Sequence, residues 1–530
     1  MVIGEILTVN ATNFPGKVAL IMEEEQYTYE QMNEGANRIA HGLIKRGVEE
    51  GMRIAILEKT SARSIQGIFG VAKSGATLVM INNLLRPREL EFILQDSQPS
   101  ILLLGENYID PISSIRERLP SIQNFFSLGQ GAKGVLSFQE WTEGDCPANP
   151  EKQVREKAIF NLLYTAGTTG IPKAAIYSHG RFWQNLLSTV IDTPGMGYED
   201  IWLGPVPLYH IGGFATVIRA FLMTNTLILR ESFDPQAYLK TLEEKKVSIL
   251  YAYPTMIHAL VNHPEARKYD YSALRLVVYG GSAMPLSTLE KACEVFQCAF
   301  LQRYGATECC GSGISVLSSE DHRRSMEGGE KARRRLTSAG RPTLGTLVKI
   351  VDEKGVTLTQ PGSLGEIVAR LNAPMEGYWQ RPEDTRETLQ NGWLHTGDVG
   401  MKDEDGYLYI VDRKKDMIIS GARNIYPREI EEILHAHPAI LEAAVIGVPD
   451  EYWGESVKAV VVLREGVKTA EEEIIRFCKE HLASYKKPRS VEFVESLPKN
   501  PGGKIDKKEL KRLYGRGQEK LLVSSLRGLG

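Results

Sequence analysis

Tyr164-Thr-Ala-Gly-Thr-Thr-Gly-Ile-Pro-Lys173 is the stretch from which the fold and the chemistry of this chain can be predicted. It combines two glycines, three threonines and one lysine, and it follows the apolar, strand-like residues 158–163. Glycines let backbone N–H groups surround an anion, threonine hydroxyls add donors, and a lysine supplies positive charge. The composition predicts a loop that binds the phosphates of a nucleotide.

The alternative interpretation of a Gly/Thr-rich run is a surface turn. Two better known nucleotide motifs do not fit. A Walker A loop has Gly before its Lys and Ser or Thr after it, whereas Pro172 and Ala174 hold these places here. No GxGxxG fingerprint follows a strand-like run. The stretch therefore predicts a nucleotide loop of a third kind.

This loop closely resembles the signature loop of the adenylate-forming superfamily, which contains acyl-CoA and aryl-CoA synthetases, peptide-synthetase adenylation domains and luciferases. The resemblance covers roughly residues 10 to 510, and several motifs together make it specific. The further motifs are PLYH (207–210), GGSA (280–283), RYGATE (303–308), NGWLHTGD (391–398), SGARN (420–424) and LPKNPGGKID (497–506). It implies a large N-terminal α/β lobe, residues 1–413, and a smaller, mobile α+β C-terminal domain, residues 414–530.

Apolar patterns support an α/β fold independently of the resemblance, because helix-like and strand-like segments alternate. At about 150 residues per domain, a chain of 530 residues suggests ~2–4 lobes. The charged run 318–335 lacks periodicity and predicts an exposed loop. Helices are expected at 29–43, 61–73, 86–96 and 428–435, and strands at 53–57, 77–81, 100–104, 158–163, 441–448 and 457–463.

The composition excludes several classes of protein. A net charge of −3 provides no basic face for nucleic acid, and 42% hydrophobic residues are typical of a globular chain. No apolar run approaches the roughly eighteen residues of a membrane helix, and the start lacks a signal peptide. The six cysteines show no zinc or CxxC spacing. We expect a cytoplasmic enzyme with reduced thiols.

The resemblance implies an ATP site made of several motifs. Tyr304 offers an aromatic face for adenine, Thr307 a hydroxyl for a phosphate, and Glu308 an oxygen ligand for Mg²⁺. The carboxylate of Asp398 can accept hydrogen bonds from both ribose hydroxyls. The other implied nucleotide contacts are Thr165, Gly167, Thr168, Thr169, Gly170, Lys173, Gly280, Gly281, Ser282 and Arg413.

The resemblance also implies the catalytic group and the thiol site. Lys504 matches the catalytic lysine, Lys415 the pivot of a rotating C-terminal domain, and Gly421 the glycine beside which the pantetheine arm passes. An aromatic ring and cations suit the nucleotide of CoA, for which we expect Trp453, Tyr485 and Lys487. For these last three residues, ordinary charged surface is the alternative.

The acid site is less well defined by the sequence. His210 lies where, in the resembled family, the acyl channel meets the ATP phosphates, although a structural histidine is the alternative. Residues 207–215 contain no acidic side chain for a substrate ammonium group, and Asp234 suits a helix N-cap instead, so an amino-acid substrate is disfavoured. Pocket-lining residues are expected among Tyr251, Tyr253, Met256, Tyr279 and Cys309.

These features together predict an ATP-dependent acyl-CoA ligase. It would activate a fatty or aromatic carboxylic acid as acyl-AMP, release pyrophosphate, and transfer the acyl group to CoA, using ATP and Mg²⁺. One alternative is a ligase that loads the phosphopantetheine of a carrier protein, and another is a catalytically silent nucleotide-binding protein. The sequence leaves the acid, the acyl acceptor and a homodimer open.

Overall fold

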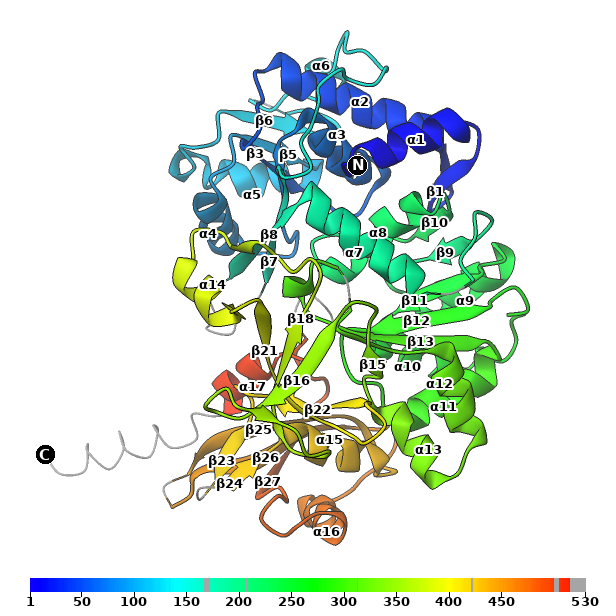
Figure 1. Cartoon of the computed structure of the whole chain (residues 1–530), viewed down its shortest axis with the longest axis vertical. Helices are drawn as coiled ribbons and strands as arrows, with labels where there is room; N and C mark the ends of the chain where they lie inside the picture. The colour runs from blue at the N-terminus through cyan, green and yellow to red at the C-terminus, as the bar shows by residue number, and fades with distance from the viewer. Residues whose placement is uncertain are drawn as a thin grey trace, which may run out of the picture. The chain divides into compact units, whose positions relative to one another are not determined.

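The computed structural model describes residues 1–132, 134–165, 172–193, 195–204, 207–311, 313–420, 423–450, 452–499 and 505–514 (Figure 1). The chain forms two compact units, each described by itself. Unit 1 comprises Met1–Ala283, Glu290–Val348 and Ala369–His395, and unit 2 comprises Met284–Leu289, Lys349–Val368 and Thr396–Gly530. The mixed α/β architecture confirms the predicted fold class.

The first sheet of unit 1 has the order β19-β8-β7-β4-β3-β5-β6. Its central strands are parallel, and β8 pairs antiparallel with both β7 and β19. The predicted strands at 53–57, 77–81, 100–104 and 158–163 are confirmed. The members are β3 (Arg53–Leu57), β4 (Thr77–Met80), β5 (Ile101–Leu104), β6 (Asn124–Ser127), β7 (Ile159–Thr165), β8 (Lys173–Ser178) and β19 (Gly377–Tyr378).

The second sheet of unit 1 has the order β15-β14-β13-β12-β11-β9-β10-β1-β2 (Figure 1). Strands β1 and β9 to β13 pair in parallel, so their carboxyl ends lie at one edge of the sheet. The members are β1 (Val18–Met22), β2 (Glu25–Thr28), β9 (Ile201–Leu203), β10 (Thr226–Leu229), β11 (Ile249–Ala252), β12 (Leu276–Gly280), β13 (Ala299–Tyr304), β14 (Ser315–Leu317) and β15 (Arg341–Pro342).

The helices of unit 1 begin where their capping residues predict. Thr28 and Ser61 accept hydrogen bonds from backbone N–H groups in the first turns of α2 and α3, and Asp234 caps α9 as expected. The helices predicted at 29–43, 61–73 and 86–96 are confirmed. The helices are α1 (Glu5–Asn13), α2 (Tyr29–Lys45), α3 (Ala62–Ser74), α4 (Pro87–Ser97), α5 (Ile109–Ser113), α6 (Phe138–Trp141), α7 (His179–Ile191), α8 (Ile211–Leu222), α9 (Pro235–Glu244), α10 (Pro254–Asn262), α11 (Leu286–Phe296) and α14 (Pro382–Thr388).

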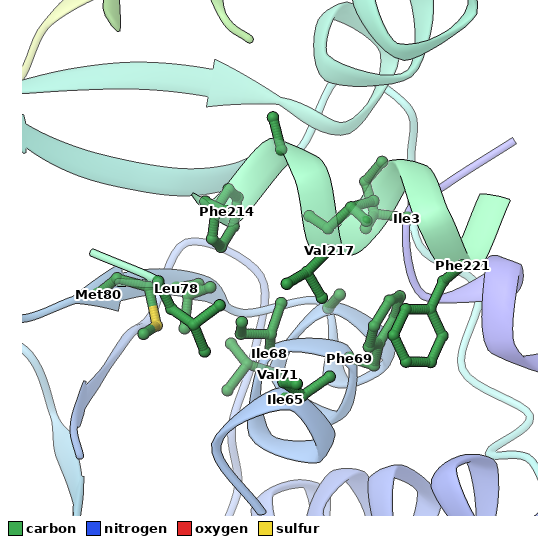
Figure 2. Packing of buried hydrophobic residues seen from close by; sticks show 14 of the residues in the cluster. Ile3, Ile65, Ile68, Phe69, Val71, Leu78, Met80, Phe214, Val217 and Phe221 are labelled. Carbon is green, nitrogen blue, oxygen red and sulfur yellow. The ribbon is translucent and has the colours of Figure 1, made fainter. Parts of the chain in front are cut away.

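A continuous apolar core packs α3 against α8 (Figure 2). The rings of Phe69 and Phe221 lie 5.4 Å apart, and Ile68 and Val217 are fully buried in the same cluster. Residues of both sheets, among them Leu78 and Val278, belong to this cluster. Because α8 is fixed by this packing, the residues along it are held firmly against the second sheet.

The prediction of an exposed loop at 318–335 is wrong. This run forms α12 (Ser319–Glu327) and α13 (Glu330–Arg334). Ser318 and Asp321 form a capping box at the start of α12, and His322 is buried with its Nε2 2.9 Å from the Tyr279 hydroxyl. Tyr279 belongs to a strand about forty residues earlier in the sequence, so local periodicity did not reveal its contact with His322.

Two further sheets lie mainly in unit 2, although β20 of the first one is formed by residues of unit 1. One has the order β17-β16-β18-β21-β20 with β22 beside β21, and the other has the order β24-β23-β26-β25 with β27 beside β26. The helix predicted at 428–435 and the strands at 441–448 and 457–463 are confirmed. The elements are β16 (Leu347–Val351), β17 (Thr357–Leu358), β18 (Gly365–Arg370), β20 (Leu389–Gln390), β21 (Trp393–Lys402), β22 (Leu408–Arg413), β23 (Ile418–Ser420), β24 (Arg423–Ile425), β25 (Ile440–Asp450), β26 (Gly454–Leu463), β27 (Ser490–Phe493), α15 (Pro427–Ala436), α16 (Glu471–His481) and α17 (Lys507–Tyr514).

Among the helices in the described ranges, none has the length and apolar character required to cross a membrane. All six cysteines are free thiols, as expected.

Because of buried His179, we expect the free energy of unfolding to fall measurably in acid. The side chain is fully buried at the start of α7, its Nδ1 accepts the Ile3 N–H at 3.2 Å, and burial lowers its pKa from 6.5 to about 4. Between these two values the unfolded chain binds a proton that the folded chain does not. The contribution of His179 to the free energy of unfolding therefore falls by about 3 kcal/mol as the pH drops from 6.5 to 4.

Urea unfolding of the wild type and of His179→Gln at pH 7.5 and pH 5 tests this expectation. The variant should lose less stability between the two pH values than the wild type. An identical loss in both proteins would show that His179 does not titrate in this way.

Candidate active site

Glu308 is held by residues from the first sheet of unit 1. It lies in the single turn η3 (Thr307–Cys309) directly after β13, and its Oε1 accepts the Tyr378 hydroxyl at 2.5 Å. The Met375 N–H donates to the Glu308 carbonyl at 2.9 Å, and the Tyr177 hydroxyl donates to the Thr307 carbonyl at 2.6 Å. Glu308, whose carboxylate is expected to bind a metal, is thus held by hydrogen bonds at its backbone and at its side chain.

Lys173 lies beside the same tyrosine. It opens β8, forms an ion pair with Asp384, and its Nζ lies 5.6 Å from the centre of the Tyr378 ring. Thr165 and Lys173 are paired in the β7–β8 ladder, so the two ends of the predicted phosphate loop meet. A cation suited to phosphate and a carboxylate suited to a metal are therefore brought together around Tyr378.

Tyr378 acts as a hydrogen-bond donor in this cluster. Burial raises the pKa of its phenol well above the usual value, and the neighbouring Glu308 carboxylate raises it further. The phenol therefore stays protonated throughout the physiological range and donates to Glu308. This donation fixes one oxygen of the carboxylate and leaves the other as a ligand atom.

The residues expected around adenine lie at the carboxyl ends of β12 and β13. Gly280 is paired with Arg303, and a Cβ atom on Gly280 would lie 2.4 Å from the Arg303 carbonyl oxygen, so only glycine fits. Gly281 has a φ of +86°, which glycine adopts at little cost, and Ser282 follows it. Tyr304 ends β13. Ligands of open parallel sheets bind at this edge.

His210 is the N-cap of α8. Its Nδ1 accepts the Gly212 N–H at 3.2 Å and lies 3.3 Å from the Tyr253 hydroxyl. These contacts give it a structural role, and a role at the acid remains a prediction.

The predicted pocket residues do not all share one side of the second sheet. Tyr251 and Tyr253 lie with their rings 6.4 Å apart, edge to face. Tyr279 neighbours Ala252 in the ladder and bonds to His322, so it points to the other face from Tyr251. Met256 is buried in the first turn of α10, and the Cys309 thiol accepts the Ala306 N–H at 3.4 Å.

In unit 2 the two residues expected at the ribose are paired with each other. Asp398 and Arg413 are neighbours in the β21–β22 ladder, and the Arg413 Nε lies 2.6 Å from the Asp398 Oδ1. Asp398 lies inside β21 and not at the end of a tight turn. The turn lies earlier, at Asn391 and Gly392, which both have positive φ.

The two aromatic residues proposed for CoA each lie beside an arginine of unit 2. The Arg489 guanidinium lies 5.0 Å from the Trp453 ring, whereas Arg423 lies 4.8 Å from the Tyr485 ring. Both rings are partly exposed and already have cationic neighbours, as binding of phosphates nearby would require. Lys487 is half-buried, and Lys415 is exposed in the turn between β22 and β23.

Six of the predicted site residues lie outside the described residues: Gly167, Thr168, Thr169, Gly170, Gly421 and Lys504. Conversely, sequence reasoning missed Tyr378 and Asp384. No pattern marks them, because their significance comes only from contacts with Glu308 and Lys173, which lie 70 and 211 residues away.

Two family descriptions match the chain. Residues 7–379 match the AMP-binding enzyme family, and residues 429–504 match the AMP-binding enzyme C-terminal domain.

Curated proteins and solved structures resemble the chain over nearly its whole length. A fatty acid–[acyl-carrier-protein] ligase, ScoC, of Streptomyces coeruleorubidus is 35% identical and covers 97% of this chain and 96% of its own. The long-chain fatty acid–CoA ligase FadD13 of Mycobacterium tuberculosis is 35% identical, with 97% and 98% covered. The crystal structure of the anthranilate CoA ligase AuaEII with anthranoyl-AMP superposes with a TM-score of 0.88 at 28% identity, with 97% of each chain covered.

The motifs, the fold and these similarities agree. The chain belongs to the AMP-binding enzyme family and, within it, to the acyl-CoA synthetase type.

Proposed function

We propose that this enzyme joins a carboxylic acid to the thiol of CoA in two steps, with acyl-AMP as the intermediate. The observation that carries the proposal is the convergence of Lys173 and Glu308 on Tyr378, at the edge of the sheets where parallel strands end. A carboxylate is a poor acyl donor because its leaving group would be oxide. Transfer of AMP to the carboxylate provides a good leaving group.

In the first step a carboxylate oxygen bonds to the α-phosphorus of ATP while the bond to pyrophosphate breaks. Negative charge builds on the phosphate oxygens, so catalysis depends on positioning and electrostatic stabilisation. Lys173 is proposed to contact the outer phosphates, Thr307 a phosphate oxygen, and Lys504 both the attacking carboxylate and the α-phosphate. Asp398 and Arg413 are proposed to hold the ribose.

Glu308 is the proposed ligand of Mg²⁺. Among the described residues, no three His, Cys, Asp or Glu side chains form a metal cluster of their own. This fits Mg²⁺, which usually binds one or two carboxylates together with substrate phosphates and water. When bound, the ion would supply positive charge to the departing pyrophosphate.

Tyr378→Phe should weaken the use of Mg²⁺ without removing the ligand. The variant loses the hydroxyl that orients Glu308, and the loss of one hydrogen bond to a charged group corresponds to about a tenfold effect. The Mg²⁺ concentration for half-maximal AMP release should rise by roughly this factor. An unchanged Mg²⁺ requirement would mean that Glu308 is not the ligand. Tyr409→Phe, in unit 2, is the matched control.

In the second step the CoA thiolate attacks the acyl carbon, and AMP leaves. We propose that residues 414–530 act as a separate domain that turns about Lys415, so that the face carrying Gly421 replaces Lys504 at the acyl-AMP. Trp453, Tyr485 and Lys487 are the proposed contacts of the CoA nucleotide. Movements of this kind commonly separate the partial reactions of an enzyme.

A carrier protein remains the second candidate for the acyl acceptor, because ScoC, a similar protein, is named for a carrier-protein acceptor while FadD13 is named for CoA. AMP release from a panel of fatty and aromatic acids, with and without CoA, tests the proposal. Acyl-CoA formation and acid-dependent AMP release are expected. Release of AMP that free CoA does not accelerate would favour the carrier protein. A cytoplasmic location and a homodimer remain predictions.

A further inference from the structure

Two arginines that influence each other's charge are buried in unit 1. Arg219, on α8, is 4% exposed, and Arg303, on β13, is 8% exposed. The Arg303 guanidinium donates to the Thr189 carbonyl at 2.8 Å and to the Thr193 hydroxyl. Three of their nitrogens are buried without an acceptor: Nε of Arg219, and Nε and one terminal nitrogen of Arg303.

The two positive charges are not balanced. Among the described residues, no carboxylate lies within ion-pair distance of either guanidinium. The titratable groups that influence Arg219 are Arg303 and the Tyr251 phenol, and those that influence Arg303 are Asp192 and Tyr251. The one acid in this set is Asp192; burial raises its pKa, and the charge of Arg303 opposes that shift.

Both groups nevertheless remain cations near neutral pH. Burial lowers the pKa of Arg219 to about 9, helped by the repulsion of Arg303, and burial lowers that of Arg303 to about 10. A buried charge without a partner is strongly destabilising, and an orphaned donor adds to the cost. Perturbed buried charges of this kind mark candidate binding sites, and a ligand that suits this one is an anion or a strong hydrogen-bond acceptor.

Arg219 and Arg303 lie on the same side of the second sheet as Tyr251, which was predicted to line the acid pocket. Because side chains alternate along strands, Tyr251, Gly280 and Arg303 face the same side of the second sheet. The hydrogen bonds of Arg303 to Thr189 and Thr193 show that the end of α7 covers this side. Arg219 joins them from α8.

One chain of aromatic contacts connects the pair with His210. Tyr251 packs edge to face on Tyr253, whose hydroxyl lies 3.3 Å from the His210 Nδ1. Arg219 follows His210 by nine residues, which is about 13 Å along a helix. Helical side chains lean toward the N-terminus, so the guanidinium lies nearer to His210 than its Cα atom does.

We propose that Arg219 and Arg303, with Tyr251, form the far end of the acyl site and bind a second carboxylate of the substrate, so that the enzyme prefers dicarboxylic acids. The proposal rests on the proposed function, since it takes the His210 end as the place where the first carboxylate is activated. The second carboxylate would accept the orphaned N–H donors and neutralise the buried charge.

Suberic acid and octanoic acid form the test pair, because they have the same length and differ only in a carboxylate or a methyl group at the far end. We expect kcat/KM for AMP release to be at least about tenfold higher for suberic acid with the wild-type enzyme. Adipic and sebacic acids, each against its monocarboxylic partner, show at which length the second carboxylate reaches the arginines.

Arg219→Met removes one charge and keeps most of the volume. It should lower kcat/KM for suberic acid about a hundredfold and change that for octanoic acid by less than about threefold. Arg219→Lys should recover part of the loss. Arg267→Met, at an exposed arginine paired with Glu294, is the matched control and should leave both values unchanged.

Each result decides the proposal. A wild-type preference for octanoic acid, or an equal fall for both acids in Arg219→Met, would overturn the dicarboxylate site but leave the ligase function intact. Failure to release AMP with every acid would overturn the proposed function and this inference with it. If Arg219→Met does not fold, the wild-type comparison of each acid pair still decides the question.

Discussion

Replacing Lys504 with alanine is expected to abolish adenylate formation while largely sparing thioester formation from supplied acyl-AMP. Adenylation builds negative charge between the attacking carboxylate and the α-phosphate, where a lysine ammonium is most effective. Loss of one such group typically costs about 10²–10³ in rate. In the proposed mechanism thioester formation proceeds in the other pose, without Lys504 at the site, so its rate should change by less than about threefold.

The two rates are measured separately, as acid-dependent pyrophosphate exchange and as acyl-CoA formation from synthetic acyl-AMP. Lys499→Ala is the matched control. Lys499 lies five residues before Lys504, and its ammonium bonds to Glu442 at 2.6 Å in a half-exposed ion pair that contributes little to stability. Equal losses of both rates in Lys504→Ala would contradict the mechanism with two poses.

The second large effect is expected for Glu308→Gln. Glutamine keeps the shape and can still accept the Tyr378 hydroxyl, so the fold around η3 should be retained. The variant loses the negative charge proposed to bind Mg²⁺ and therefore the proposed position of the ion beside the pyrophosphate. Adenylation should fall by about 10²–10³, and higher Mg²⁺ should recover only part of the rate.

Pyrophosphate exchange over a Mg²⁺ titration checks this expectation. Glu320→Gln provides the control, because Glu320 lies in exposed ion pairs with Arg323 and Arg324 on α12. A Glu308→Gln enzyme with the wild-type Mg²⁺ dependence and rate would rule out Glu308 as a ligand.

Much of the fold could be predicted because its signals are local. Apolar patterns identified α2 and α3 to within two residues, and continuous apolar runs identified β3 and β5. The helix α12 was not predicted because its buried contact, the hydrogen bond between His322 and Tyr279, joins residues far apart in sequence.

In the candidate site, too, local signals could be predicted from the sequence and contacts between distant residues could not. Short motifs located Lys173, Glu308 and Asp398, since each motif carries its own chemistry. The partners Tyr378 and Asp384 could not be predicted, because they become relevant only through tertiary pairing with Glu308 and Lys173. Arg219 is the clearest case, since an arginine within an apolar helix has no meaning until its lack of a counter-ion is seen.

Acid-dependent exchange of labelled pyrophosphate into ATP tests the central claim most directly, because it reports formation of acyl-AMP and nothing later. In the absence of CoA, the wild-type enzyme with Mg²⁺ and an accepted acid should exchange label rapidly, and omitting the acid should stop it. Exchange that required CoA, or that continued without any acid, would contradict the account.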